Sequence, residues 1–228
     1  MTATRERRAI VDTVRWLMAR RLYTGTSGNV SARSGGGLLI TPTGLVCDEV
    51  DAASIVALTM DGVARGALPP SSEWRIHRDI YRGRPDVGAV VHTHSTFATA
   101  LSCLRRPVPA FHYMVAKAGG DDLPCARYAT YGSEALSRNA LAALDGRRAC
   151  LLANHGLLAL GADVASARLL AQEIEALCAQ YVHARAAGRP VVLPAREISH
   201  VRAKFATYGA TSTSGARAAR RRNGASFD

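Results

Sequence analysis

The spacing of apolar residues along the chain predicts an alternation of helices and strands. Ile10, Val14, Leu17 and Met18 recur at helical intervals, so an amphipathic helix is expected over residues 5–22. Further helices are expected over 72–82, 96–103, 132–144 and 162–188. Short apolar runs bounded by Gly, Pro, Asn or Asp predict strands within 34–45, 55–62, 88–94 and 149–156.

This order of elements indicates one α/β domain in which helices cover a sheet. The sequence shows no internal repeat and no linker that would divide it. We therefore expect a single domain over residues 1–208. Residues 209–228 are rich in Arg, Ser, Gly and Ala and are expected to form a basic, disordered tail.

Composition limits the classes of protein to consider. The 228 residues are 48% hydrophobic and 21% charged, and no apolar run approaches the roughly 18 residues that span a membrane. The basic N-terminus is interrupted by Asp12 and Arg15, which is unlike a secretory signal. Five cysteines without CxxC spacing suggest neither a disulfide framework nor a thiolate metal site. These features predict a cytoplasmic protein with no membrane partner.

The net charge of +11 raises the question of nucleic-acid binding. Most of it lies at the two ends: six arginines against two acids over residues 5–21, and four arginines against Asp228 in the tail. Arginines in the middle of the chain are dispersed and lack interleaved aromatic residues on which bases could stack. We therefore expect no nucleic-acid partner.

Three histidines stand at the ends of apolar runs. On a strand, His92 and His94 would point to the same face, and the run ACLLANHG ends close to His155. Two neighbouring strands that end together would bring three imidazoles to one point, and catalytic zinc needs three protein ligands. The alternative is that His92 and His94 bind nothing and that His155 only caps a loop. The other histidines (His77, His112, His183 and His200) are expected on the surface or on a helix face.

Glu73 is the nearest candidate for a catalytic carboxylate. It lies in PPSSEWRIH, at the expected start of a helix. A carboxylate beside a metal can move a proton during reactions at carbon. A glutamate in the first helical turn can equally serve as a cap, so this segment alone leaves both interpretations open.

Three segments could bind a phosphate group. TGTSGNVS, TPTG and PSS each combine small residues, free backbone N–H groups and hydroxyl or amide donors. Gly28 would let the backbone approach the ligand, and Asn29 would donate from its amide. Each segment alone is an ordinary turn, but the three together favour a small phosphorylated ligand.

The motifs GTSGNVSAR, ITPTG, PSSEWRIH, VVHTHS, YATYGS and LLANHGLLALG, in this order, resemble the class II, zinc-dependent sugar-phosphate aldolases of the L-fuculose-phosphate aldolase type. The resemblance covers roughly residues 5–208. It implies a central, mainly antiparallel sheet covered by helices, and a homotetramer with active sites between subunits. The same superfamily holds epimerases, dehydratases and the adducin head domain.

The resemblance also implies roles for individual residues. One Zn²⁺ per subunit would be held by three histidines and by Glu73, which doubles as the catalytic carboxylate. Tyr113 would reach the active site of the neighbouring subunit and act on a hydroxyl or aldehyde oxygen. Tyr131 and Tyr208 would line the aldehyde side of the pocket. The implied metal ligands and phosphate contacts are His92, His94, His155 and Glu73, and Gly28, Asn29, Thr43, Gly44, Ser71 and Ser72.

The expected reaction is reversible cleavage of a ketose 1-phosphate, such as L-fuculose 1-phosphate or a 5-deoxypentulose 1-phosphate, to dihydroxyacetone phosphate and a small aldehyde. Glu73 speaks against an epimerase, in which an aspartate stands at this position. A methylthioribulose-1-phosphate dehydratase or a decarboxylating relative remains the alternative. An adducin-like interaction domain is disfavoured because all three histidines and Glu73 are present.

Overall fold

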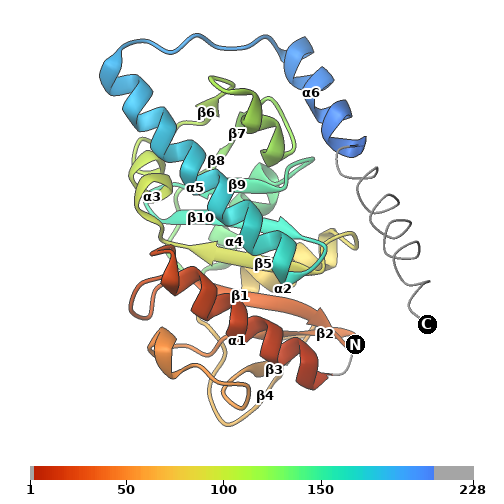
Figure 1. Cartoon of the computed structure of the whole chain (residues 1–228). Coiled ribbons are helices and arrows are strands. Elements are labelled where there is room, and N and C mark those ends of the chain that lie inside the picture. Colours follow the sequence, from red (N-terminus) through yellow and green to blue (C-terminus); the bar gives the residue numbers. More distant parts are fainter. Residues whose placement is uncertain (1–2, 208–228) are drawn as a thin grey trace, which may run out of the picture.

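The computed structural model describes residues 3–207, and its centre is one eight-stranded sheet within that range (Figure 1). The strand order is β4-β3-β2-β1-β5-β10-β9-β8. A separate two-stranded ribbon pairs β6 (Val108–Pro109) with β7 (Asp122–Leu123). The strands of the large sheet are β1 (Asn29–Ser34), β2 (Gly37–Ile40), β3 (Val56–Thr59), β4 (Ala64–Arg65), β5 (Ala89–Thr93), β8 (Cys125–Ala126), β9 (Ala149–Leu152) and β10 (Gly156–Gly161).

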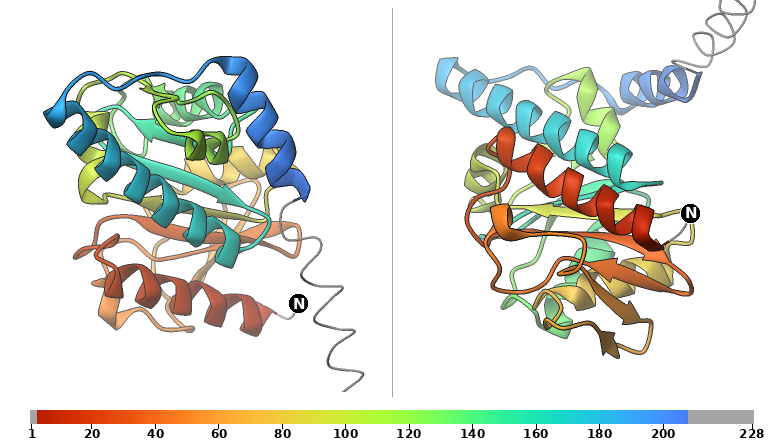
Figure 2. Two further views of the ribbon diagram at one scale, coloured as in Figure 1. Left: turned by 45° about the horizontal axis from the view of Figure 1, so that its top comes forward. Right: turned by 60° about the horizontal axis from the view of Figure 1, so that its bottom comes forward.

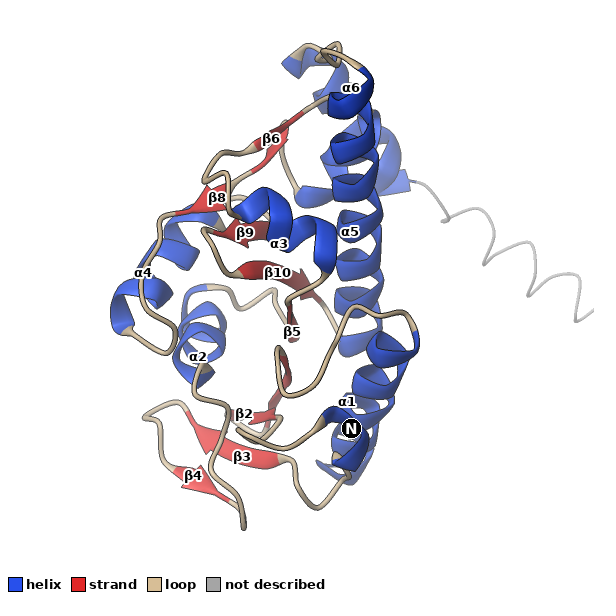
Figure 3. Ribbon diagram, turned by 90° about the vertical axis from the view of Figure 1, so that its left-hand side faces the viewer, coloured by secondary structure: helices blue, strands red, loops and turns tan. Residues whose placement is uncertain are grey.

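Neighbouring strands of the large sheet run antiparallel, except that β8 and β9 are parallel. Helices cover both faces. α1 and α5 pack on one face and α2 and α4 on the other, as Figure 3 shows from the side. The expectation of an α/β fold with a mainly antiparallel sheet is confirmed. The helices are α1 (Ala3–Ala19), α2 (Trp74–Gly83), α3 (Thr96–Ser102), α4 (Glu134–Ala143), α5 (Val164–Ala187) and α6 (Ala195–Thr207), with 3-10 turns η1 (Cys47–Glu49) and η2 (Tyr113–Ala118).

The two covered faces explain why the central strands are apolar throughout. Side chains of a strand alternate between faces. Val91 accordingly packs in the cluster beneath α1 and α5, while Val90 packs in the cluster beneath α2 and α4. Leu157 and Leu158 of β10 divide between the faces in the same way. α1 and α5 also contact each other on the face of the sheet that they cover (Figure 2).

The predicted helices at 5–22, 72–82, 96–103, 132–144 and 162–188 correspond to α1 to α5. The prediction of a strand ending near residue 156 was wrong: β9 ends at Leu152 and a new strand, β10, begins at Gly156. α6 was not among the predicted elements. The predicted tail at 209–228 lies outside the described residues. Among residues 3–207, no helix has the length and apolar character needed to cross a membrane.

Candidate metal centre and active site

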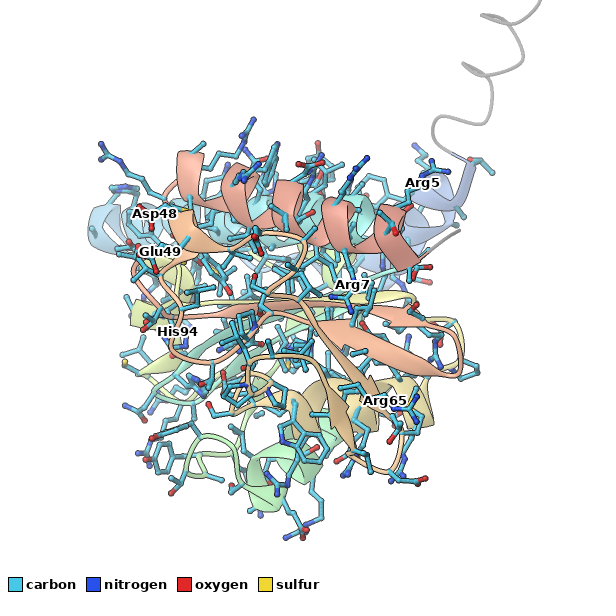
Figure 4. The ribbon with its side chains drawn as sticks, turned by 90° about the horizontal axis from the view of Figure 1, so that it is seen from below. Arg5, Arg7, Asp48, Glu49, Arg65 and His94 are labelled. Carbon is cyan, nitrogen blue, oxygen red and sulfur yellow. The ribbon has the colours of Figure 1, made fainter. Side chains whose placement is uncertain are left out.

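The side chains of three histidines meet where β5 ends and the adjacent strand β10 begins, in the middle of the sheet: His92, His94 and His155. Their ring centroids lie 4.8, 4.8 and 4.9 Å apart, and each pair of rings is inclined by 74° to 78°. His92 is the fourth residue of β5, and His94 follows the last residue of that strand. Figure 4 shows His94 on the same side of the molecule as Asp48 and Glu49, away from Arg65 of β4. The predicted convergence of three imidazoles is present.

His155 reaches this point by a different route from the one the sequence suggested. The chain leaves β9 after Leu152 and reverses through three residues, in which Asn154 takes a left-handed conformation with φ of 52°. β10 then runs antiparallel to β5. His155 therefore stands beside the end of β5 because it immediately precedes β10, not because its own strand ends there.

The Glu73 carboxylate points into the histidine cluster. It is only 6% exposed, and it precedes α2 without capping that helix through its side chain. Glu73 Oε2 lies 3.2 Å from His92 Nε2, and Oε1 lies 3.2 Å from His155 Nε2. Of the two interpretations left open by the sequence, the geometry excludes a side-chain cap and places the carboxylate with the imidazoles.

The donor atoms of the cluster are arranged as ligands for a cation. His92 Nδ1 lies 2.9 Å from the carbonyl oxygen of Leu157, to which it donates, so Nε2 of the neutral ring carries a lone pair. That Nε2 lies 3.0 Å from His94 Nε2 and faces Glu73 as well. Glu73 Oε1 is buried and has no hydrogen-bond donor among residues 3–207. The four ligand atoms lie within 4.8 Å of one another, so these residues could hold a metal ion.

The charges within the cluster shift its protonation equilibria. Burial alone would raise the pKa of Glu73, but His92, His155 and the Asn29 amide together hold it well below its usual range. Burial and the neighbouring His92 lower the pKa of His94 and of His155 to about 4. Burial works against a charged His92, yet the adjacent Glu73 outweighs it and raises the pKa of His92. At neutral pH the cluster therefore offers a carboxylate and two uncharged imidazoles, which is the form that binds metals.

A pocket of about 420 Å³ opens over this cluster. All six residues predicted to contact a phosphate line it: Gly28, Asn29, Thr43, Gly44, Ser71 and Ser72. Glu73, His94 and His155 line the same pocket. Gly28 and Gly44 both have positive φ, which turns the backbone at these positions in a way that other residues rarely adopt. The three separate turns of the sequence thus form one surface.

The outer wall of the pocket is aromatic. Tyr131, predicted for this wall, is 67% exposed, and Tyr128 beside it is 54% exposed. Arg105 stacks on Tyr128 and donates to the Asn154 side chain. The sequence did not single out six of the lining residues individually, although each lies inside one of the motifs quoted above: Thr26, Ser27, Pro42, Tyr128, Ala129 and Asn154.

His77 corrects part of a prediction. It lies on a face of α2, which was one of the two expected places, but that face is fully buried against β1 and is not at the surface. Its two ring nitrogens contact Asn29 and Ser31. The helical spacing of α2 shows which face His77 occupies, but not that polar side chains of β1 line the opposing surface. His183 and His200 are exposed, as expected.

Comparison with known proteins identifies the family. The model of the class II aldolase and adducin N-terminal domain matches residues 8–182, well over half of the chain. The chain belongs to this family.

Relatives within the class II aldolase family are similar over nearly their whole length. The chain is 51% identical over 203 residues to 5-methylthioribulose-1-phosphate/5-deoxyribulose-1-phosphate aldolase of Rhodospirillum rubrum, covering 89% of this chain and 92% of that protein. It is 46% identical to L-fuculose phosphate aldolase of Escherichia coli, covering 89% and 94%. A solved structure of L-fuculose 1-phosphate aldolase superposes with a TM-score of 0.87 at 39% identity, covering 90% of this chain and 98% of that one.

One tyrosine that the family resemblance singled out does not line this pocket in the described part of the chain. Tyr113 lies in η2, is 47% exposed, and is absent from the residues that line the pocket. Within residues 3–207 of one chain it is not brought to the Glu73 carboxylate. Tyr208 lies outside the described residues. A role for Tyr113 in this class II aldolase therefore requires a second copy of the chain.

Proposed function

We propose that the protein is a zinc-dependent aldolase that reversibly cleaves a ketose 1-phosphate to dihydroxyacetone phosphate and a small aldehyde. One observation carries the proposal: Glu73 and two of the clustered histidines line the same pocket as the six predicted phosphate contacts. Metal ligands, a carboxylate and phosphate donors within one pocket suit the cleavage of a phosphorylated sugar. The names of the relatives, which are ketose-phosphate aldolases, support the same activity.

His92, His94, His155 and Glu73 would hold the metal ion. Three nitrogen ligands and one carboxylate form a donor set that zinc favours. When bound, a divalent zinc ion supplies Lewis acidity, which withdraws charge from the ketose oxygens as the carbon–carbon bond breaks. The ligand geometry of the chain fits this ion, since the buried Glu73 Oε1 otherwise lacks a hydrogen-bond partner among residues 3–207.

Residues of the chain itself would bind the phosphate and transfer the protons. The small residues of the phosphate-binding turns hold the phosphate and so fix the reacting carbon relative to Glu73. In cleavage, the proton of the C4 hydroxyl would pass through solvent to the Glu73 carboxylate, and the C3–C4 bond would break with its electron pair left on C3. The protonated Glu73 would then return that proton to C3 of the enediolate and become a carboxylate again. In synthesis the Glu73 carboxylate removes that proton. Tyr113 of a neighbouring subunit would assist proton transfer at the C4 oxygen.

The aldehyde half of the substrate is set by the exposed wall of the pocket. Tyr131 lies there, and we propose that Tyr208 contributes to the same side. The named relatives act on 5-deoxyribulose 1-phosphate, 5-methylthioribulose 1-phosphate and L-fuculose phosphate, so these sugars are the candidates for this chain. We further propose a homotetramer in the cytoplasm, in keeping with the five free cysteines and the location of Tyr113.

Release of dihydroxyacetone phosphate tests this function. The zinc-loaded and EDTA-stripped protein would be incubated with each of the three ketose 1-phosphates, and the product measured with a coupled glycerol-phosphate dehydrogenase. We expect zinc-dependent release that falls by about 10²-fold or more in Glu73→Gln, since general acid–base catalysis contributes that much. The control is Glu134→Gln, because Glu134 is an exposed residue of α4. Consumption of the sugar without dihydroxyacetone phosphate would indicate a dehydratase instead.

A further inference from the structure

A chain of hydrogen bonds runs through the buried interior from α2 to the Glu73 carboxylate. The Tyr81 hydroxyl lies 2.7 Å from Ser31 Oγ, and Ser31 Oγ lies 2.7 Å from His77 Nδ1. His77 Nε2 contacts Asn29 Oδ1, and Asn29 Nδ2 donates to Glu73 Oε2 over 2.9 Å. All five residues are buried, with exposed fractions between 0% and 6%.

The chemistry of the groups determines which atom donates in each hydrogen bond of this series. A carboxylate can only accept, so Asn29 must present its NH₂ group to Glu73 and its carbonyl oxygen to His77. The carbonyl oxygen is itself only an acceptor, and therefore His77 carries its proton on Nε2. Nδ1 of the neutral ring then accepts from Ser31, whose oxygen accepts from Tyr81.

Asn29 is the link between this chain and the ligand pocket. Its side-chain nitrogen has two hydrogens, of which one is directed at Glu73. Asn29 also lines the pocket, so the second hydrogen is available to a phosphate. Rotation of the amide by 180° would turn the carbonyl oxygen toward the carboxylate and the pocket, where both a carboxylate and a phosphate would repel it.

We infer that His77 is a positioning residue, which holds the Asn29 amide in the one orientation that both supports the Glu73 carboxylate and presents a donor to the phosphate of the substrate. The inference rests on the proposed function for the phosphate, but its effect on Glu73 concerns the metal site alone. His77 itself touches neither the metal ligands nor the pocket.

The environment of His77 agrees with a fixed, uncharged ring. Burial, and then the neighbouring His92, lower the pKa of His77 to about 3. A buried histidine that only filled space would be replaced without loss by an apolar side chain, whereas this one satisfies both ring nitrogens with polar partners. The inference depends on one contact, the hydrogen bond that His77 Nε2–H donates to Asn29 Oδ1.

The test is a double-mutant cycle between His77 and Asn29. The variants are His77→Phe, which removes the donor, His77→Gln, whose amide can still donate to Asn29, Asn29→Ala, and the double variant His77→Phe/Asn29→Ala. Tyr81→Phe is the control for disturbing the far end of the buried chain. Two quantities are measured for each: the Zn²⁺ dissociation constant by competition with a chelating dye, and kcat/KM for the best ketose 1-phosphate. Thermal unfolding of each variant records general destabilisation.

We expect His77→Phe to weaken Zn²⁺ binding and to lower kcat/KM, each by about 10-fold or more, which is the usual effect of losing the support of a ligand. His77→Gln should recover most of both losses, even where its thermal stability resembles that of His77→Phe. In the Asn29→Ala background the His77→Phe change should cost little further, since the residue acts through Asn29.

Additive effects in the cycle, or equal losses in His77→Phe and His77→Gln, would overturn the inference and reduce His77 to a core residue. The Zn²⁺ measurement separates this result from the proposed function. If the variants show this coupling in Zn²⁺ affinity but the wild-type protein cleaves no ketose phosphate, the positioning role of His77 stands and the aldolase proposal fails.

Discussion

Glu73 shows at the scale of one residue how a buried charge is used. The free energy cost of burying a carboxylate is offset by two imidazoles and one amide, so the group stays ionised inside the protein. The NH₂ group of Asn29 donates a hydrogen bond to the Glu73 carboxylate, and Asn29 also lines the pocket. These four polar side chains would be costly in an ordinary core, which is why their convergence indicates a functional site.

Gly28 is predicted to be irreplaceable because two constraints meet there. Its φ is +96°, and a Cβ would lie 2.7 Å from the His92 carbonyl oxygen and 2.5 Å from the Tyr23 ring. Gly28→Ala should lower the free energy of unfolding by about 2 kcal/mol or more and raise KM for the sugar phosphate. The matched control is Gly25→Ala, where φ is +60° but no atom lies within 4 Å of the added carbon.

Urea unfolding and steady-state kinetics measure both effects. Gly25→Ala should show only the backbone cost of about 1 kcal/mol with an unchanged KM. Equal behaviour of the two variants would contradict the close approach of Gly28 to the strand that carries His92.

At the scale of elements, two features bring the histidines together: the tight β9–β10 reversal and the antiparallel pairing of β10 with β5. α5 then holds the chain that follows His94. Glu175 of α5 accepts hydrogen bonds from the Ser95 hydroxyl and from the backbone N–H groups of Phe97 and Ala98, all at 2.8 Å. The segment that follows His94 is thus held by α5, a helix that also packs against β5 and β10.

The elements also show what the sequence could and could not predict. Helical periodicity predicted α1 to α5, because each buries one face. A continuous apolar run predicted β5, which is buried on both faces. The β9–β10 reversal was missed because ACLLANHGLLALG is apolar on both sides of the turn. Only three residues separate the strands, and the turn depends on the left-handed conformation of Asn154. The placement of His77 depends on which polar residues of β1 oppose α2, and periodicity within one element carries no information on its partner.

The N-terminus of α5 offers a test of this packing through pH. The Asp163 carboxylate accepts a hydrogen bond from the Ser166 backbone N–H, in a capping box, and this hydrogen bond lowers the pKa of Asp163 from its usual range. A lowered pKa in the folded state means that the stabilisation is complete above the unfolded pKa and is lost as the pH falls through the folded one. Asp163→Ala should therefore cost about 1 kcal/mol at pH 7, and this difference should shrink below about pH 4.

Urea unfolding at pH 7 and pH 3 measures the difference. Asp163→Asn is the control, because an asparagine caps a helix nearly as well without titrating. A difference between wild type and Asp163→Ala that stays constant with pH would contradict the role of the carboxylate.

At the scale of the whole molecule, the location of Tyr113 bears on the proposed assembly. The metal-ligand cluster and the phosphate-binding turns come from a single copy, whereas Tyr113 lies half exposed on η2, outside the pocket. The family resemblance that places this tyrosine in a neighbouring active site thus agrees with its location. Assembly would then be a condition of activity.

Subunit mixing tests shared sites directly. Glu73→Gln and Tyr113→Phe chains should each be nearly inactive alone. Co-expressed in equal amounts, they should regain about a quarter of wild-type activity, since that share of sites in a randomly mixed oligomer pairs an intact Glu73 with an intact Tyr113. No recovery in mixed oligomers, confirmed as mixed by differently tagged chains, would place Tyr113 outside the reaction.

The measurement that tests the central claim most directly is a zinc titration of the stripped protein, read as the rate of dihydroxyacetone phosphate release from 5-deoxyribulose 1-phosphate and L-fuculose 1-phosphate. The account predicts that the rate rises from near zero and saturates at about one Zn²⁺ per chain, and that His155→Ala neither saturates there nor regains activity. Release at full rate from the stripped protein, or stoichiometric zinc binding with no release from either sugar, would contradict it.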